Sequence, residues 1–218
     1  MTGLVGRRRA ESPERDRSRM VRRQLRRREI RDERVIEAMA TVPREAFVPV
    51  SLLSRAYEDA ALSIGEGQTI SQPYIVAAMC ELLGLDGSER VLDVGTGSGY
   101  AAAVLDELGA SVVSIERIPS LAERARAALA ATGHASIEVR VGDGRVGAPD
   151  RAPFDAIAIA AATPEIPVAL LDQLAVGGRL VAPRGGREGQ RLVRVVKTED
   201  GQDEAVGLGC RFVPLVGD

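Results

Sequence analysis

The stretch of this sequence with the clearest chemical meaning is VLDVGTGSGY, residues 91–100. An apolar run leads into one acid, Asp93, and then into glycines at alternate positions, Gly95, Gly97 and Gly99. Glycine lets a backbone turn sharply and approach a ligand closely where a strand passes into a helix. The pattern is typical of a loop that holds a nucleotide-type cofactor at the end of a parallel strand.

The spacing of the glycines distinguishes two classes of cofactor. A dinucleotide fingerprint, GxGxxG, requires a glycine at position 100, where this chain has Tyr100. The GxGxG pattern instead indicates S-adenosylmethionine, which carries a cationic sulfonium, an amino group and one carboxylate. Such a ligand tolerates a nearby acid like Asp93, whereas a pyrophosphate favours a bare helix N-terminus. Thr96 and Ser98, between the glycines, belong to the same expected cofactor site.

Two further acids follow predicted strands. Glu116 ends the run SVVSIE, at the place where an acid binds both ribose hydroxyls in either class of cofactor. Asp143 lies between Gly142 and Gly144, directly after the predicted strand IEVRV. Asp93, Glu116, Asp143 and Gly144 would therefore meet at one edge of a sheet and form the cofactor site. A flavin or nicotinamide site, or a structural βαβ turn, is the alternative interpretation.

The rest of the chain predicts the elements that position these residues. A chain of 218 residues suits one domain, and its core must be aliphatic, because 45% of its residues are hydrophobic and only 3% aromatic. Alternating elements predict a doubly wound, Rossmann-like α/β fold with a mostly parallel sheet. The expected strands are 91–94, 111–116, 136–141, 154–160 and 178–183, the expected helices are 99–108, 119–131 and 166–174, and 191–196 and 206–215 should form antiparallel C-terminal strands.

The N-terminal part divides into three expected segments. Residues 1–17 are polar and rich in arginine, which predicts a flexible leader before a single domain, 18–218. Within that domain, 18–88 should supply helices and a substrate loop, and 89–218 the cofactor-binding core. Asp32 is placed to cap the second helix of this segment. The stretch IGEGQTISQ, 64–72, lacks periodicity and predicts an ordered loop before a helix begun by Pro73.

Charge and composition limit the partners. The net charge of -2 gives no general attraction to nucleic acid or membranes. The first 34 residues hold 13 arginines and 6 acids, so an RNA-binding arm is an alternative of another class, although no aromatic residue lies among these arginines. Two distant cysteines, the lack of a membrane-spanning run and the lack of a secretory signal predict a cytoplasmic monomer without a metal site.

Beyond the cofactor motif, the sequence resembles the protein-L-isoaspartate O-methyltransferases, from Met20 to Leu215. The GQTISQP loop is peculiar to that family, whereas GxGxG occurs in methyltransferases at large. The resemblance implies methyl transfer from S-adenosylmethionine to the α-carboxyl of L-isoaspartyl residues in damaged proteins and peptides, giving an ester that collapses to a succinimide and reopens partly as aspartate. It is carried by VPREAFVP at 42–49, GQTISQPYIVAAM at 67–79, VLDVGTGSGY at 91–100, GDG at 142–144, APFDAIAI at 152–159 and FVPL at 212–215.

The resemblance also assigns residues to the substrate. The active-site serine of the family corresponds to Ser71, and Thr69, Ser71 and Gln72 could position a carboxylate. A carboxylate is ionised at neutral pH, so its attack on a methyl group needs alignment rather than a general base. By the same resemblance, Gly67 and Gln68 beside Thr69 shape a lid over the cofactor, Val213 and Pro214 line the isoaspartyl pocket through their backbone, and Ala160 to Ala162 close the cofactor site.

Two positions depart from the family pattern. Relatives commonly carry Arg-Gly where this chain has Arg28-Glu29, a change that should alter only a turn between helices. Arg184 replaces a valine after Pro183 and is expected to face water. The single histidine, His134, is expected at the surface. An alternative within the same fold is a methyltransferase acting on another carboxylate, such as one in a modified peptide.

Overall fold

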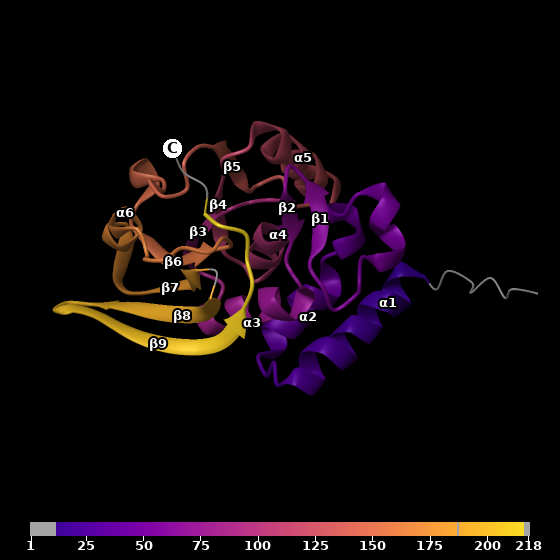
Figure 1. The fold of residues 1–218 in the computed structure, drawn as a ribbon, viewed down its shortest axis with the longest axis horizontal. Helices are drawn as coiled ribbons and strands as arrows, with labels where there is room; N and C mark the ends of the chain where they lie inside the picture. Colours follow the sequence, from indigo (N-terminus) through magenta and orange to yellow (C-terminus); the bar gives the residue numbers. More distant parts are fainter. Residues whose placement is uncertain (1–11, 187, 216–218) are drawn as a thin grey trace, which may run out of the picture.

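A seven-stranded sheet in the order β5-β4-β3-β6-β7-β8-β9 forms the centre of the structure, a computed structural model that describes residues 12–186 and 188–215 (Figure 1). The strands from β5 to β7 run parallel, and β8 and β9 are antiparallel, so the predicted Rossmann-like arrangement is confirmed. These strands are β3 (Arg90–Val94), β4 (Ser111–Glu116), β5 (Glu138–Val141), β6 (Phe154–Ile159), β7 (Leu174–Gly186), β8 (Gly189–Thr198) and β9 (Gly201–Cys210).

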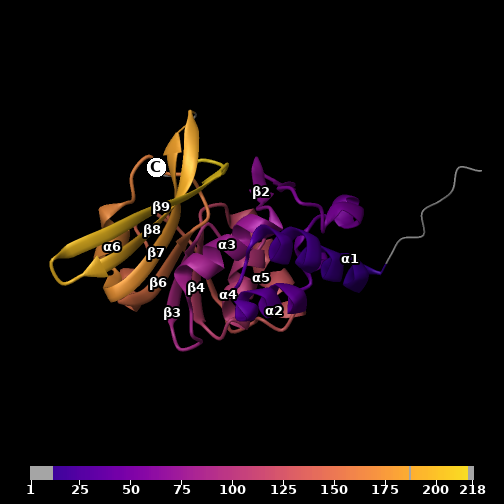
Figure 2. The same ribbon diagram turned by 90° about the horizontal axis from the view of Figure 1, so that it is seen from below.

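Helices cover both faces of this sheet, as Figure 2 shows with α1 and α6 on opposite sides. In β3, Val91 packs into a core shared with α2 to α5, whereas Leu92 and Val94 pack into a second core with Leu170 of α6. None of the helices in the described residues is long and apolar enough to cross a membrane. The helices are α1 (Pro13–Met20), α2 (Glu33–Thr41), α3 (Pro73–Leu83), α4 (Tyr100–Glu107), α5 (Pro119–Ala131) and α6 (Val168–Asp172).

The last strand lies earlier in the chain than the sequence predicts, whereas the expected strand 191–196 falls within β8. Thr198 pairs with Gly201, so the chain reverses over two residues and β9 ends at Cys210 instead of extending to Leu215. Residues 211–215 therefore leave the sheet and run back across the molecule (Figure 1). The expected antiparallel pairing is confirmed, but the expected bounds of the last strand, 206–215, are wrong.

The segment expected to be an ordered loop is a β-hairpin. Its strands are β1 (Leu62–Gly65) and β2 (Gln68–Ile70), joined by a turn in which Gly65, Glu66 and Gly67 all have positive φ angles of 88°, 54° and 70°. Leu62, Ile64 and Ile70 are buried and alternate with exposed positions, which is the pattern of a half-buried strand. The alternation could not be recognised in the sequence, because Gly65 and Gly67 interrupt it.

The N-terminal helices differ from expectation at their start. Helix α1 begins at Pro13, so residues 13–17, expected to be flexible, are helical, while 1–11 lie outside the described residues. The expected cap of α2 is confirmed, since Asp32 Oδ1 accepts a hydrogen bond from the backbone N–H of Arg34 at 2.9 Å. Between the two helices, Glu29 has a φ of 67°, in the left-handed region that favours glycine.

Two side chains expected to face water are paired with acids. His134 is only 6% exposed, and its Nδ1 lies 2.7 Å from Asp106 Oδ2, so the expectation of a surface position was wrong. Arg184 Nη2 donates to Glu204 Oε1 at 2.6 Å and thereby joins β7 to β9 across β8, while its side chain remains 36% exposed to water. Neither partner could be foreseen, because they lie 28 and 20 residues away in the sequence.

Replacing Glu29 with glycine should stabilise the protein by about 1 kcal/mol, because a non-glycine residue loses roughly 1–2 kcal/mol in the left-handed conformation and glycine loses part of that gain to entropy. The free energy of unfolding in urea measures this difference. As a control, Glu123→Gly on the exposed face of α5 should change stability with the opposite sign, by about 1 kcal/mol. Destabilisation by both substitutions would contradict the conformational explanation.

Glu89 fixes the turn that leads into β3. Its carboxylate accepts the backbone N–H groups of Asp86 and Gly87, each at 2.9 Å, and that of Ser88 at 3.1 Å. Arg179 of β7 completes the set, with Nη2 at 3.0 Å from Glu89 Oε1. Burial of the carboxylate acts to raise its pKa, but these hydrogen bonds prevail and lower the pKa of Glu89 to about 2.

The stability that Glu89 supplies should depend on pH. Its pKa is about 2 in the folded protein against an ordinary value of 4.5, so the contribution is complete above pH 4.5 and disappears as the pH falls toward 2. Glu89→Gln should therefore cost about 1–3 kcal/mol at pH 7, the usual range for hydrogen bonds to a charged group, and much less at the acid end. Urea unfolding at a series of pH values tests this, and a difference independent of pH would refute it.

Candidate active site

The glycine loop after β3 is folded back over the end of β4. The backbone N–H groups of Gly95 and Thr96 both donate to Ile115 O, at 2.8 and 3.1 Å. The N–H of Gly97 donates to Glu116 Oε2 at 2.7 Å. These three bonds join the end of one strand to the end of its neighbour, so the loop and Glu116 form one rigid unit.

The backbone of this loop requires glycine. Gly95, Gly97 and Gly99 have φ angles of 97°, 55° and 91°, all in the region that other residues rarely adopt. At Gly99 a side chain would also approach Leu129 Cγ of α5 to 3.2 Å. The glycines thus permit both the turn and the close packing of α4 on α5.

The hydrogen bonds of the loop also bear on the kind of ligand. Besides the three N–H groups that bind Ile115 and Glu116, that of Gly99 donates to Thr96 O at 2.8 Å. A phosphate group at a helix N-terminus is bound by free N–H groups. Because these donors are used within the protein, the loop suits a nucleoside ligand that carries no phosphate there.

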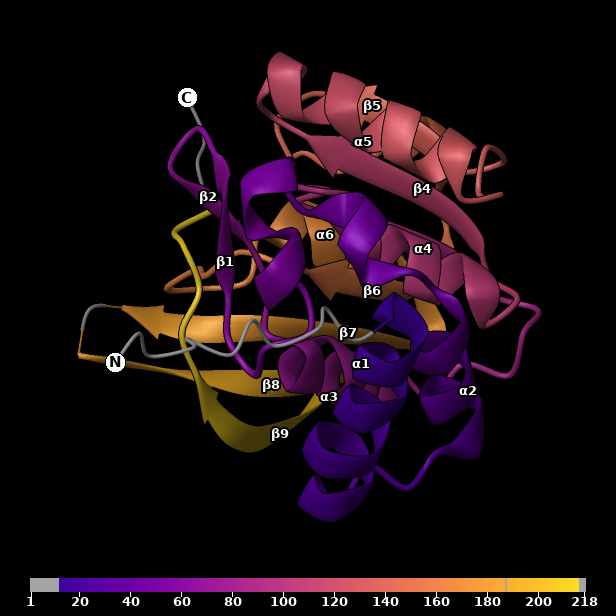
Figure 3. The same ribbon diagram turned by 90° about the vertical axis from the view of Figure 1, so that its right-hand side faces the viewer.

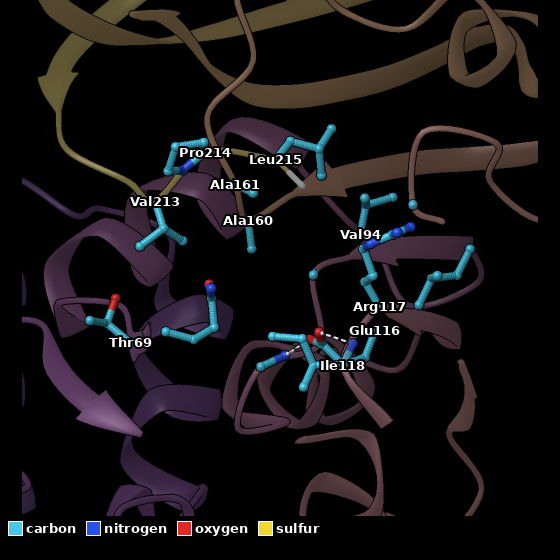
Figure 4. A pocket seen from close by; sticks show the side chains of 15 residues that line it. Thr69, Val94, Glu116, Arg117, Ile118, Ala160, Ala161, Val213, Pro214 and Leu215 are labelled. Carbon is cyan, nitrogen blue, oxygen red and sulfur yellow. Dashed lines mark hydrogen bonds between the residues drawn. The ribbon is translucent and has the colours of Figure 1, made fainter. Parts of the chain in front are cut away.

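A cavity opens beside the loop, at the carboxyl ends of β3, β4 and β6 (Figure 4). Thr69 and Val213 lie on one side of it, and Glu116 lies on the other. It is lined by Gln68, Thr69, Val94, Gly95, Gly97, Ile115, Glu116, Arg117, Ile118, Gly144, Ala160, Ala161, Val213, Pro214 and Leu215.

Glu116 is the acid that reaches this cavity. It is 6% exposed, and its two oxygens accept the N–H groups of Gly97 and Ile118, at 2.7 and 2.9 Å. Each oxygen keeps a second acceptor position, so the carboxylate could accept two hydroxyl groups of a ribose. Its orientation is fixed before any ligand binds.

The chain after β9 forms the opposite wall. The N–H of Ala162 donates to Val213 O at 2.8 Å, and the N–H of Leu215 donates to Ala162 O at 2.7 Å. These bonds hold Val213, Pro214 and Leu215 against the segment that follows β6, beside the hairpin β1–β2 (Figure 3). Leu215 was not among the predicted cofactor residues, although it ends the FVPL motif.

A second cavity adjoins the first on the side of the hairpin. Thr69 and Val213 line both cavities, and Ser71 and Gln72 line only the second. The carboxamide of Gln72 is held by Asp59, with Nε2 at 2.7 Å from Oδ1. The remaining lining consists of Arg28, Ala61, Ile75, Leu208, Gly209, Cys210, Arg211 and Phe212.

Asp93 lies behind the glycine loop and does not line either cavity. It is completely buried, and Ser114 Oγ donates to its Oδ2 at 2.6 Å, while Oδ1 has no partner among the described residues. Burial raises the pKa of Asp93 to about 6, with a further contribution from the charge of Glu116. Asp93 therefore lies behind the first cavity, whereas Glu116 brings a carboxylate into it and Arg117 a guanidinium.

The other predicted cofactor residues are distributed around this cavity. Thr96 is buried, with its hydroxyl 2.5 Å from Ser114 Oγ, and Ser98 lines a separate hollow with Gly97. Asp143 is held by Arg145, whose Nη2 lies 2.8 Å from Oδ2, and does not line the cavity. Gln68, Gly144 and Ala160 do line it, and a side chain at Gly144 would meet Val94 Cγ1 at 2.5 Å.

Sequence reasoning missed several wall residues. Ile115, Arg117 and Ile118 lie on either side of Glu116 and line the cavity with it, as does Val94. They could have been inferred because they adjoin the predicted end of a strand. Where the end of a strand brings one residue to a cavity, its neighbours in the chain lie close to the same cavity. Among the described residues there is no group of three or more histidine, cysteine or acidic side chains that could bind a metal ion.

Comparison with known proteins gives consistent matches along the chain. The model of the family "Protein-L-isoaspartate(D-aspartate) O-methyltransferase" matches residues 15–218. A protein-L-isoaspartate O-methyltransferase of Methanoculleus marisnigri is 58% identical over 205 residues, which cover 93% of this chain and 92% of the relative. Protein-L-isoaspartate O-methyltransferase 2 of Marinobacter nauticus is 56% identical over 201 residues, covering 91% of this chain and 92% of the relative.

Solved structures agree with these matches. A protein-L-isoaspartate O-methyltransferase superposes with a TM-score of 0.84 at 30% identity, over 92% of this chain and 66% of the other. The corresponding protein of Plasmodium falciparum, in complex with S-adenosyl-L-homocysteine, gives a TM-score of 0.81 at 24% identity, over 92% of this chain and 98% of its own. The second similarity establishes the shared fold.

Replacing Glu116 with glutamine should weaken the binding of S-adenosylhomocysteine by about tenfold or more, the usual loss when a hydrogen bond to a charged group is removed. The carboxamide can no longer accept on both sides, so one of the N–H groups of Gly97 and Ile118 also loses its acceptor. Isothermal titration calorimetry measures the dissociation constant. Glu107→Gln, an exposed position at the end of α4 that removes the same charge, should bind like the parent protein, and equal weakening in both variants would count against this role.

Proposed function

This chain belongs to the protein-L-isoaspartate(D-aspartate) O-methyltransferase family, and we infer from that membership that it transfers a methyl group from S-adenosylmethionine to the α-carboxyl of L-isoaspartyl residues in proteins and peptides. The methyl ester is a better electrophile than the free carboxylate. The neighbouring backbone nitrogen therefore attacks the ester carbonyl carbon, methanol leaves, and a succinimide closes, which water reopens partly as ordinary aspartate. The reaction begins the repair of damaged proteins.

One geometric observation supports this function most directly: two cavities meet at Thr69 and Val213. The first has the glycine loop, four of whose N–H groups are bonded within the protein, and the fixed carboxylate of Glu116. The second has the serine of the GQTISQP segment. A group transferred from a ligand in the first cavity to an acceptor in the second would pass between Thr69 and Val213.

The cofactor, when bound, supplies an electrophilic methyl group on a sulfonium. Glu116 would accept the ribose hydroxyls, and Gly95, Gly97, Gly144 and Ala160 provide surfaces without bulky side chains against which the ligand can lie. Gln68 and Thr69 of β2 would cover it from the hairpin side. Asp93 acts from behind the loop, through its charge, rather than by direct contact.

The residues of the second cavity would align the acceptor. The α-carboxylate is already ionised at neutral pH, so it attacks the methyl carbon without a general base. The hydroxyl of Ser71 would donate a hydrogen bond to one carboxylate oxygen and leave the other free to attack. Val213 and Pro214 would limit the position of the peptide through their backbone. Alignment of this kind can supply roughly 7–11 kcal/mol in well-oriented systems.

The surroundings of the second cavity fit an anionic substrate. Arg28 and Arg211 line it, so its positive charge complements a carboxylate. Arg28 also forms an ion pair with Asp59, with Nη1 at 3.0 Å from Oδ2. Its Cζ lies over the ring of Tyr74, 3.6 Å from the ring centroid. His134, the only histidine of the chain, is engaged with Asp106 and lines neither cavity, in agreement with a reaction that needs no imidazole base.

We further propose a division of labour within one domain. Residues 18–88 would supply the hairpin and the serine, and residues 89–218 would supply the sheet and the cofactor site. The final residues of the second part return to the first, because Val213 lines both cavities. Catalysis therefore requires both parts.

A set of three matched peptides tests this function. Incubation with radiolabelled S-adenosylmethionine should label an isoaspartyl peptide and leave its aspartyl counterpart unlabelled. A third peptide, with the isoaspartyl α-carboxyl converted to an amide, should remain unlabelled because the attacking oxygen is gone. Equal labelling of the first two peptides, or labelling of neither, would refute the proposal.

The same assay separates the alternatives. A methyltransferase for a different carboxylate would leave the isoaspartyl peptide unlabelled. An RNA-binding role of the arginine-rich arm is independent of all three peptides and would appear as RNA retention that weakens steeply with salt. Loss of that retention on deletion of residues 1–17 would attribute it to the arm.

A further inference from the structure

A charged side chain lies completely buried in the segment VPREAFVP, whose role the cofactor and substrate cavities do not explain. Arg44 is 0% exposed and begins the 3₁₀ turn Arg44–Phe47. No acidic side chain of the described residues pairs with it, and its Nη1 has no hydrogen-bond partner there. Burial lowers the pKa of Arg44 to about 10, so it still carries its charge at pH 7.

Burying a cation without an acidic partner is unfavourable, because the charged group loses its hydration. Moving a guanidinium from water into the protein interior costs free energy of hydration that an apolar side chain of similar volume would not lose. The guanidinium must therefore do something that an apolar side chain cannot do. Its contacts indicate what that is.

The guanidinium binds two carbonyl groups from separate segments. Nε donates to Ala56 O at 2.7 Å, and Nη2 donates to Ser71 O at 2.8 Å. Ser71 lies between the end of β2 and Gln72, the residue that caps α3, so its carbonyl lies outside both elements. The planar guanidinium fixes the distance between the two carbonyls, since both donors belong to one rigid group.

The same side chain contacts the cofactor half of the molecule. Arg44 Cζ lies 4.9 Å from the centroid of the Tyr100 ring, and Phe47 of the same turn packs edge-on against that ring at 5.7 Å. Tyr100 is the first residue of α4, directly after the glycine loop. Arg44 is therefore in contact with both the serine segment and the helix that starts at the cofactor site.

We propose that Arg44 is a positioning residue, which holds the backbone of Ser71 at a fixed place relative to the glycine loop through its contacts with Ser71 O and Tyr100. The inference rests on the proposed function, in which the Ser71 hydroxyl aligns the α-carboxylate with the methyl group. Arg44 touches neither cavity, so it acts only through the residues it holds.

Two substitutions of Arg44 should reduce activity to different extents. Arg44→Lys keeps the charge but can reach only one of the two carbonyls, and Arg44→Met keeps the volume but donates to neither. With an isoaspartyl peptide, kcat/KM should fall by about tenfold in Arg44→Lys and by about a hundredfold in Arg44→Met, because small displacements of an aligning group have effects of that size. The dissociation constant of S-adenosylhomocysteine should stay within about threefold of the parent value.

A control comes from Arg34, an exposed residue of α2 whose partners precede β3 and β4, at the ends of these strands opposite the cavities. Its Nη1 and Nη2 donate to Leu85 O and Leu108 O, each at 2.7 Å, so it also joins two backbone segments. Arg34→Met should leave kcat/KM unchanged at a temperature where the protein remains folded. This control distinguishes alignment of Ser71 from a general loss of stability.

Hydrogen exchange gives a measurement that does not depend on activity. Backbone amides of residues 68–72 should exchange about tenfold faster in Arg44→Lys than in the parent protein, whereas Arg34→Met should leave them unchanged. The parent protein is first assayed with the peptide set, so a failure of the proposed function is recognised before any variant is compared.

Three results would overturn the proposal. The first is a folded Arg44→Lys protein with kcat/KM within threefold of the parent and unaltered exchange at residues 68–72. The second is a loss of S-adenosylhomocysteine affinity that parallels the loss of activity, which would indicate a general disturbance. The third is Arg44→Met retaining more activity than Arg44→Lys. If Arg44→Met does not fold, the first two results still decide the question through Arg44→Lys.

Discussion

The site depends on a single backbone constraint at the end of β4, where Ile115 O accepts the N–H groups of both Gly95 and Thr96. Those bonds are possible only because the glycines can adopt positive φ angles. Once the loop is held there, Glu116 meets the N–H of Gly97 and its carboxylate is oriented toward the cavity. The geometry of the cofactor site thus follows from the pairing of two neighbouring parallel strands.

The second cavity, in which we propose that the substrate binds, is built differently, from segments far apart in the chain. Thr69 and Ser71 come from a short hairpin and the residues after it, whereas Val213 comes from the segment beyond the last strand. Neither segment is part of the central sheet, so each is held in place by contacts of its own. Ala162 binds both Val213 and Leu215 through its backbone, and Arg44 binds Ser71. The parallel sheet supplies a rigid frame, and these few contacts place the second cavity on it.

The sequence predicted best what is local. The glycine loop, Glu116 and the helix α5 could be recognised because their signals are complete within about 15 residues, and the resemblance carried by GQTISQP led to Ser71. The hairpin was missed because Gly65 and Gly67 interrupt the alternation of Leu62, Ile64 and Ile70. The role of Leu215 and the pairing of His134 with Asp106 could not be foreseen, since each depends on a partner distant in the sequence. Asp93 is an acid at the end of β3, as expected of a cofactor-binding residue. However, side chains alternate along a strand, and that of Asp93 points into the core with α3 and α4 rather than into the cavity.

The return of residues 213–215 to the first cavity has a consequence for folding. These residues lie beside Thr69, which is more than 140 positions away in the sequence. The parallel sheet and the glycine loop can form without them, but the cavity lacks one wall until this distant segment docks. Contacts between segments far apart in the sequence close long loops and form slowly, so the cavity is expected to be completed after the sheet.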